Sequence, residues 1–338
     1  MKIFKYKKTM IGLSILCILL IVSLLYPLYG PKDFNKVVFL YDEKGDLVGV
    51  PPLSPNSDFP LGSDRNGQDI LLMILYGAKF TLLTAFSVAI LRVLVGGVLG
   101  IVFSLWLKRI QPIFKDVLLV FKIVPPIIMT IFLMRRVSFY IVDVNVFNIL
   151  LYQVIILSII GIPSVLFMTA GIIDELKGKS FIQSSYLMGG GHFHVLKKQF
   201  LPYLKSYGVL MLVQQLLHTL TLVMYLGVYQ IYIGGISKDE VRGADVLNSN
   251  AKEWAGLVGQ NIYEFFRAPH IVLVPLICYF IIIIIINMMK KELESSMSLN
   301  PLAITLNKKR SKQKQTANDF KKVPITSSDF TLQKDFFS

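Results

Sequence analysis

Two short stretches of the sequence carry residue types that bind nucleotides or metals in other proteins. The tripeptide GKS at residues 178–180 matches the end of a phosphate-binding P-loop, but that motif needs another glycine five residues earlier, where this chain has Ile173. His192 and His194 have no Cys or carboxylate partner at a useful spacing. We therefore expect neither an ATP site nor a metal site in the chain itself, and no catalytic group or directly bound cofactor.

A second set of polar side chains lies inside long apolar runs. A charged residue in such a run is costly, so Arg92 is expected either to line a water-filled cavity or to snorkel toward an interface. Gln214, His218 and Thr221 share one helical face, which either lines a pore or hydrogen-bonds to a neighbouring helix. The clean apolar runs have no acidic residue near their middle, and proton or sodium coupling normally uses one. If the protein transports a solute, we expect the energy to enter through another subunit.

The elements that must position these side chains are transmembrane helices. The chain of 338 residues is 54% hydrophobic and only 17% charged, and its apolar residues gather in runs longer than about 18 residues. We predict an all-α polytopic membrane protein with six transmembrane helices. The spans are expected at about residues 10–29, 80–107, 112–134, 144–173, 207–233 and 271–289.

The distribution of charge predicts the topology. The net charge is +14, and the Lys and Arg residues concentrate in segments that would face the cytoplasm, so positive-inside topology explains them better than nucleic-acid binding. Both termini are then cytoplasmic, and the basic tail is expected to be disordered or to lie on anionic lipid. We divide the chain into an N-terminal segment with the first helix (1–30), an extracellular loop (31–78), the main transmembrane domain (79–291) and the basic cytoplasmic tail (292–338).

Glycine, proline and aspartate mark the ends and breaks of these helices. Asp69 is placed to cap the helix that follows it. Gly96 and Gly100 form a GxxxG pattern, which permits close helix approach. Pro125 and Pro126 would kink or break the third helix near mid-membrane, and such breaks are tolerated where neighbouring groups or water satisfy the freed carbonyls. Arg92, Gln214, His218 and these two prolines are our candidates for a translocation path.

The longest polar interruption with helix-like spacing is the segment 174–202. It is charged at both ends and pivots on the glycines at 189–191, which predicts a folded loop presented to a partner. Its spacing resembles the cytoplasmic EAA loop in permease subunits of binding-protein-dependent ABC importers. The positions that carry this resemblance, and that it assigns to coupling with an ATPase, are Gln183, Ser184, Ser185, Gly189, Gly191, Leu201 and Pro202. The sequence departs from the family pattern at Gln183, where Glu is usual, and at Gln199, where Ile is usual.

A second motif is similar to the branch of that family that serves peptides and nickel. The stretch LGSDRNGQD at residues 61–69 follows the LGTDxxGRD pattern of the branch ahead of its second helix. The resemblance covers about residues 60–301, and residues 234–251 look like an insertion. Two separate motifs at matching topological positions make the resemblance specific.

The resemblance implies a type I ABC importer permease-like bundle with a cytoplasmic coupling helix, in which Pro202 starts the next helix. It further implies a permease for oligopeptides or a related small solute in a bacterial plasma membrane. The implied partners are a second permease subunit in a heterodimer, ATP-binding subunits that supply the ATP, and an extracellular solute-binding lipoprotein. A non-transporting scaffold or sensor that kept a degenerate permease fold is the alternative, and a self-sufficient secondary transporter comes third.

Overall fold

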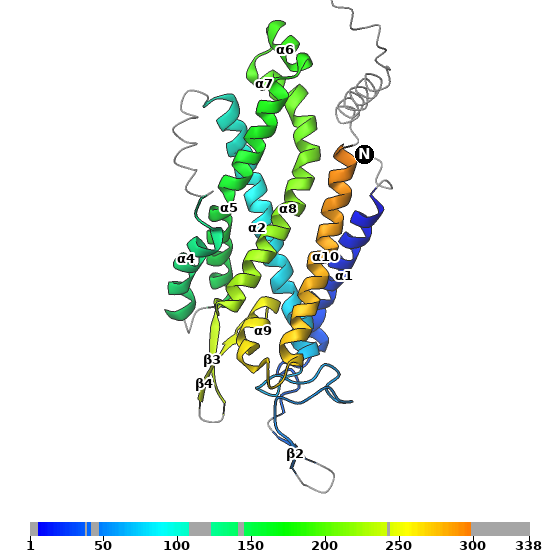
Figure 1. Ribbon diagram of the computed structural model, residues 1–338, viewed down its shortest axis with the longest axis vertical. Helices are drawn as coiled ribbons and strands as arrows, with labels where there is room; N and C mark the ends of the chain where they lie inside the picture. The colour runs from blue at the N-terminus through cyan, green and yellow to red at the C-terminus, as the bar shows by residue number, and fades with distance from the viewer. Residues whose placement is uncertain are drawn as a thin grey trace, which may run out of the picture. The chain divides into compact units, whose positions relative to one another are not determined.

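The structure is a computed structural model that describes residues 6–37, 39–41, 47–107, 123–140, 145–241 and 244–298. The chain divides into two compact units, Met1–Lys290 and Lys291–Ser338. The first unit contains a bundle of long helices with smaller elements at its ends (Figure 1). In the second unit, the described residues are helical and end at Ser298.

Five helices of the described chain are long and apolar enough to cross a membrane by length and composition. They are α1 (Lys7–Tyr29), α2 (Ile70–Leu105), α5 (Val146–Lys177), α8 (Leu201–Val228) with the turns that precede it, and α10 (His270–Ser298). Each is longer than the roughly 20 residues that a membrane span requires. The prediction of a mostly helical, multi-pass membrane protein is confirmed.

The third predicted span, about 112–134, falls partly on residues 108–122, which lie outside the described residues. Its described part is α4 (Pro126–Tyr140), whose apolar portion Pro126–Arg135 is too short to count as a span by itself. The helix begins at Pro126, a position where the missing N–H costs nothing because the first turn has no intrahelical partner for it. The two prolines therefore mark the start of a described helix.

Helices α2, α5 and α8 form the centre of the bundle. In the most apolar stretch of each of these helices, between 44% and 56% of the residues are buried, compared with 22% in α1. α2 packs along α5 because glycines remove the side chains that would hold the two helices apart. A Cβ atom at Gly96 would lie 2.8 Å from Cβ of Val165, and one at Gly100 would lie 2.7 Å from the carbonyl oxygen of Leu166. The predicted close approach at this GxxxG pattern is confirmed.

α2 begins at Ile70, inside the segment 31–78 that the sequence analysis assigned to an extracellular loop. Its cap is the predicted one, because the Asp69 carboxylate accepts a hydrogen bond of 2.8 Å from the backbone N–H of Leu71. The first two turns of α2 therefore belong to the helix and not to the loop.

Short elements gather at the end of the bundle that carries α9 (Trp254–Asn261), which we call the α9 end (Figure 1). They include the hairpin of β1 (Leu40–Tyr41) and β2 (Leu47–Gly49), and the 3-10 helix η3 (Ile262–Glu264). The predicted insertion at 234–251 is an antiparallel hairpin of β3 (Ile236–Val241) and β4 (Ala244–Ser249), with Ile236 opposite Ser249. These strands are the described exceptions to an all-α fold.

Candidate functional site

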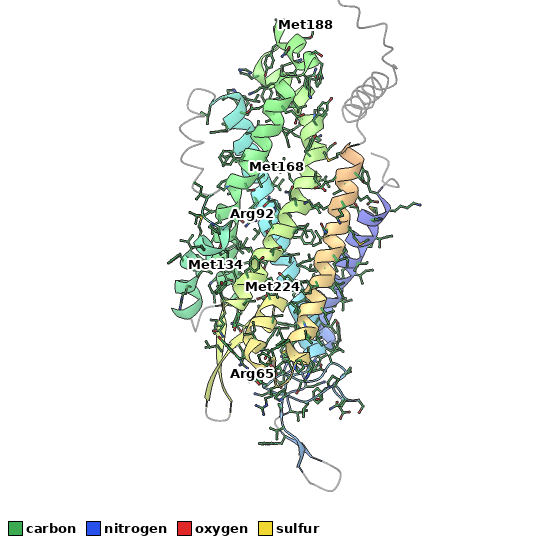
Figure 2. The ribbon with its side chains drawn as sticks, in the orientation of Figure 1. Arg65, Arg92, Met134, Met168, Met188 and Met224 are labelled. Carbon is green, nitrogen blue, oxygen red and sulfur yellow. The ribbon has the colours of Figure 1, made fainter. Side chains whose placement is uncertain are left out.

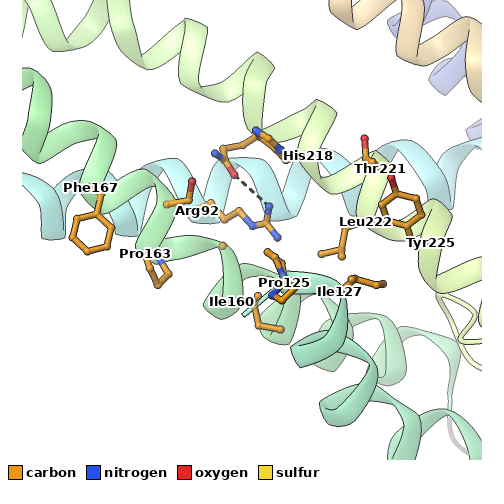
Figure 3. A pocket seen from close by; sticks show the side chains of 14 residues that line it. Arg92, Pro125, Ile127, Ile160, Pro163, Phe167, His218, Thr221, Leu222 and Tyr225 are labelled. Carbon is orange, nitrogen blue, oxygen red and sulfur yellow. Dashed lines mark hydrogen bonds between the residues drawn. The ribbon is translucent and has the colours of Figure 1, made fainter. Parts of the chain in front are cut away.

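A cavity of about 550 Å³ lies among α2, α5, α8 and the start of α4 (Figure 3). Its volume is within the range of small-molecule sites in proteins. Most of its lining is apolar, but the exposed side chains of His218 and Thr221 also line it, so the cavity is open on that side. The full lining is Arg92, Pro125, Pro126, Ile127, Ile160, Gly161, Pro163, Ser164, Phe167, Gln215, His218, Thr221, Leu222 and Tyr225.

Arg92 is the cationic side chain of this cavity, and only 3% of its surface is exposed. Its Nε and Nη2 donate to the carbonyl oxygen of Leu157 at 3.1 and 2.6 Å, and its Nη1 donates to Oε1 of Gln215 at 3.2 Å. Gly161 makes room for this geometry, since a Cβ atom there would collide with the Arg92 side chain. Of the two environments left open by the sequence, the structure places Arg92 in a cavity.

The other predicted path residues divide between the cavity and its surroundings. Pro125, Pro126 and His218 line it with Arg92, whereas Gln214 does not and Gln215 takes its place. Helical spacing explains the change, because Gln215, His218 and Leu222 follow one another at intervals of three and four residues. The sequence contains that spacing for either glutamine, so only the rotation of α8 against its neighbours distinguishes them. Their role in transport stays a prediction.

The loop predicted at 174–202 folds into two short helices, α6 (Ser180–Leu187) and α7 (His192–Val195), at what we call the α6 end of the bundle (Figure 1). Gly189 has a φ of +85°. Its N–H bonds to the carbonyl of Tyr186, and the N–H of Gly190 bonds to the carbonyl of Ser185, each at 3.0 Å. These two bonds form a Schellman motif, which requires a left-handed residue and explains a glycine four residues after Ser185.

The α6 end is fixed to the bundle by an apolar cluster and a polar network. Ile182 of α6 and Val195 of α7 are fully buried against residues from α2, α5 and the turn before α8. The buried members of this cluster are Leu105, Ile173, Leu176, Ile182, Val195 and Phe200. In addition, Nζ of Lys177 bonds to the carbonyl of Ser104 at 2.6 Å and forms an ion pair with Asp174 at 3.2 Å. The loop is therefore a packed structure carried by the ends of the long helices.

The outer surface of this loop is apolar at its tip. Leu187 and Met188 are 88% and 82% exposed, and Phe193 is also largely exposed. Figure 2 shows Met188 at the extremity of the α6 end, with Arg92 in the middle of the bundle and Arg65 toward the α9 end. Exposed apolar groups of this size on a rigid turn are typical of a contact surface.

The structure places the predicted coupling residues as follows. Gln183 and Ser184 lie exposed on α6, Ser185 is buried, and Gly191 precedes α7 with an ordinary φ of −70°. The prediction that Pro202 starts the next helix is confirmed to within one residue, because α8 begins at Leu201 and Pro202 lies in its first turn. The helical path from His192 to Val228 is nevertheless continuous. The turn Leu196–Phe200 is a π-helix in which the N–H of Leu201 bonds to the carbonyl of Leu196. This wider turn accommodates the proline ring, which would otherwise clash with the preceding turn.

The stretch 61–69 is a tight turn at the α9 end. The Asp64 side chain accepts hydrogen bonds of 2.9 Å from the backbone N–H groups of Asn66 and Gln68, and burial raises the pKa of this carboxyl. Arg65 reaches the hairpin, where its Nη2 donates to the carbonyl of Leu247 at 2.9 Å. The turn therefore joins the start of α2 to β4, two segments far apart in the sequence.

Glu253, which the sequence analysis did not single out, caps α9 from a fully buried position. Its Oε2 accepts a 2.9 Å hydrogen bond from the N–H of Ala255, and burial raises the pKa of the carboxyl to about 7. The signal was present as a Glu directly before the apolar run WAGLV, although nothing in the sequence indicates that this end is buried.

The described residues contain no group of three or more His, Cys, Asp or Glu side chains that could hold a metal ion. His192, of the HxH pair, lies 3.2 Å from the hydroxyl of Tyr186 through its Nδ1. The GKS tripeptide spans the junction of α5 and α6, where Lys179 is the residue before α6. The element directly before it is the helix α5, whereas a P-loop follows a strand.

No family model matches the chain, but several known proteins are similar to it. It is 24% identical to the oligopeptide transport system permease protein AmiD of Streptococcus pneumoniae, over 63% of this chain and 64% of that protein. It is 22% identical to the dipeptide transport system permease protein DppC of Haemophilus influenzae, over 57% and 61% of the two chains. A putative peptide permease protein of Brucella ovis is 26% identical over 56% and 57%.

The matched part thus spans less than two thirds of the length of each relative. The matches agree in kind, since each relative is named as a permease protein of a peptide transport system or as a peptide permease. The described helices agree with a multi-pass membrane protein. The chain is a homologue of the permease proteins of oligopeptide and dipeptide transport systems.

Proposed function

We propose that this chain is a permease subunit of an ATP-driven ABC importer for oligopeptides or a related small solute. Its bundle would form half of the translocation path, and a second permease subunit would supply the other half. The support is the combination of peptide-permease homologues with five candidate membrane spans, of which α2, α5 and α8 line a cavity of about 550 Å³. An extracellular solute-binding lipoprotein would deliver the solute to the α9 end.

The observation that carries the coupling role is the structure of the α6 end. Segment 174–202 presents α6 and an apolar tip on a turn that is anchored to the ends of α2, α5 and α8. A partner that moves this tip would move the buried cluster and, with it, the helices that line the cavity. ATP-binding subunits are the proposed partner, with both termini of this chain and the α6 end in the cytoplasm of a bacterial cell. The ATP would be bound by those subunits and not by this chain.

The first experiment is purification of the tagged protein in mild detergent, with identification of every chain that copurifies. We expect a P-loop ATPase and a second multi-pass permease. Recovery of this chain alone, or with unrelated membrane proteins, would instead favour a scaffold or sensor.

A surface variant then tests which part of the chain binds the ATPase. The double substitution Leu187→Ser with Met188→Ser removes the apolar tip without touching the buried cluster, and should release the ATPase while the second permease remains. Phe266→Ser is the matched control, because Phe266 is 97% exposed and lies between η3 and α10, at the α9 end. Loss of the ATPase from the Phe266 variant as well would contradict the assignment of the tip.

A further inference from the structure

Arg92 is a buried cation whose described partners are all neutral. Its three hydrogen bonds go to the backbone carbonyl of Leu157 and to the side-chain amide of Gln215. No carboxylate of the described residues lies within 4 Å of its nitrogens. Buried charges are costly and are normally paired with an opposite charge, so this arrangement leaves a positive potential without compensation.

The surrounding helices offer no acidic residue that could approach the guanidinium. α2 and α8 contain none, and α5 has its acidic residues in the last turn, at Asp174 and Glu175. Asp174 is engaged with Lys177 and Ser104 at the α6 end, far from the middle of the bundle where Figure 2 places Arg92. The missing counter-charge is therefore not supplied by the described chain.

Two N–H groups of Arg92 remain available, one on each terminal nitrogen. A guanidinium has five N–H groups, and the described hydrogen bonds use one on Nε, one on Nη1 and one on Nη2. An arginine stays protonated under physiological conditions, and its paired terminal N–H groups match the two oxygens of a carboxylate. Figure 3 shows Arg92 among the residues that line the cavity, with apolar side chains such as Ile160 and Leu222 around it.

We propose that this cavity recognises a carboxylate of the transported solute, with Arg92 as the residue that binds it. The proposal rests on the permease function proposed above and adds the chemical class of its ligand. The carboxylate is either the free C-terminus of a peptide or an acidic side chain. Leu157 and Gln215 hold the guanidinium in place, and the apolar walls accept the uncharged part of the solute.

The test is uptake by the complete complex, reconstituted in proteoliposomes with its binding protein. Three tripeptides serve as substrates: one with a free C-terminus, the same peptide with a C-terminal amide, and an amidated peptide with an Asp side chain. For each peptide, uptake by the Arg92→Gln variant is divided by wild-type uptake, so that the preference of the binding protein cancels. Lys79→Gln is the matched control, because it removes a cation from α2 at a position that does not line the cavity.

We expect Arg92→Gln to lower uptake of the free-acid peptide about tenfold to hundredfold, the effect of losing a charge-assisted hydrogen bond, and to lower uptake of the plain amide far less. Uptake of the amidated Asp peptide distinguishes the two sources of the carboxylate. If Arg92→Gln lowers its uptake as much as that of the free-acid peptide, the site binds any carboxylate, and if it lowers its uptake only slightly, the site binds the C-terminus. Arg92→Lys should keep part of the preference, since it retains the charge without the planar fork. The Lys79 control should leave all three ratios near one.

An equal loss of uptake for all three peptides would overturn the inference, because it would mean that Arg92 holds α2 against α5 and α8 and does not bind a carboxylate. The proposed permease function would not be affected by that result. Failure of both Arg92 variants to assemble would overturn the inference in the same way. Absence of uptake by the wild-type complex for every peptide would instead refute the proposed function itself.

Discussion

The turn at Gly189 gives the sharpest prediction for coupling. Its φ of +85° lies in the left-handed region, and no atom lies within 4 Å of a Cβ added there. An alanine would therefore meet no clash, and its whole cost would be the backbone conformation, about 1–2 kcal/mol for a residue with a Cβ. Because Ile182 and Val195 keep α6 and α7 packed, an alanine would relax only the turn between them, and docking of the tip would have to restore the left-handed conformation at that cost. Gly189→Ala should thus weaken binding of an ATPase subunit about 5- to 30-fold.

The assay is a titration of the detergent-purified permease pair with its ATPase subunit, accompanied by uptake in proteoliposomes. Gly189→Asn should lose much less affinity than Gly189→Ala, because asparagine tolerates the left-handed region. Gly191→Ala is the matched control: Gly191 is two residues away, has equal open space around it and has an ordinary φ of −70°, so its affinity should not change.

Two results would refute this reasoning. Wild-type affinity and uptake for Gly189→Ala, with normal assembly, would mean that the left-handed turn is not needed for coupling. Equal losses at Gly189 and Gly191 would mean that the loop responds to added bulk and not to backbone conformation.

Two further predictions concern stability in detergent. Gly96→Leu should lower the free energy of unfolding by about 1–3 kcal/mol and lower the melting temperature, because its side chain would be forced against Val165. Gly97→Leu is the control and should change little, since a Cβ atom there meets nothing within 4 Å. Similar melting temperatures for the two variants would contradict the described α2–α5 packing. The pKa of Glu253 is raised to about 7 from an ordinary value of 4.5, so the folded state favours the protonated carboxyl. The contribution of this group to the free energy of unfolding is complete below about pH 4.5 and falls by about 3 kcal/mol as the pH rises through 7. The melting temperature should therefore fall between pH 5 and pH 8 in the wild type, and Glu253→Gln should remove most of that slope; an unchanged slope in the variant would show that another group is responsible.

The membrane spans and several of their ends follow from local sequence. A run of some 20 apolar residues is sufficient for a span whatever its neighbours are, and the five described long helices lie where such runs were predicted. A cap depends on one side chain and the next few N–H groups, which is why Asp69 was identified correctly. The loop at 174–202 was also predictable, because a polar segment with glycines at 189–191 interrupts two apolar runs.

Other features depend on groups that are distant in the sequence. The Asp69 cap predicted a helix from Ile70, but the boundary predicted at residue 78 left its first turns in the loop, and only the structure shows one continuous helix from Ile70 to Leu105. Pro202 lies in the first turn of α8, as predicted, but only the structure shows that a π-helical turn joins this helix to α7. Whether Gln214 or Gln215 faces the cavity depends on the rotation of α8, which is set by packing against α2 and other neighbours.

The sequence by itself determined that this chain is a multi-pass membrane protein with a glycine-hinged loop between two spans, because hydropathy and backbone preference act over a few neighbouring residues. It also showed that Arg92 is a charge in an apolar helix, but not which groups surround it. The tertiary structure decided which groups these are, because Leu157 and Gln215 come from two other helices and contact the guanidinium only when α2, α5 and α8 pack together. The cavity, its uncompensated charge and its apolar walls exist only in that packed arrangement.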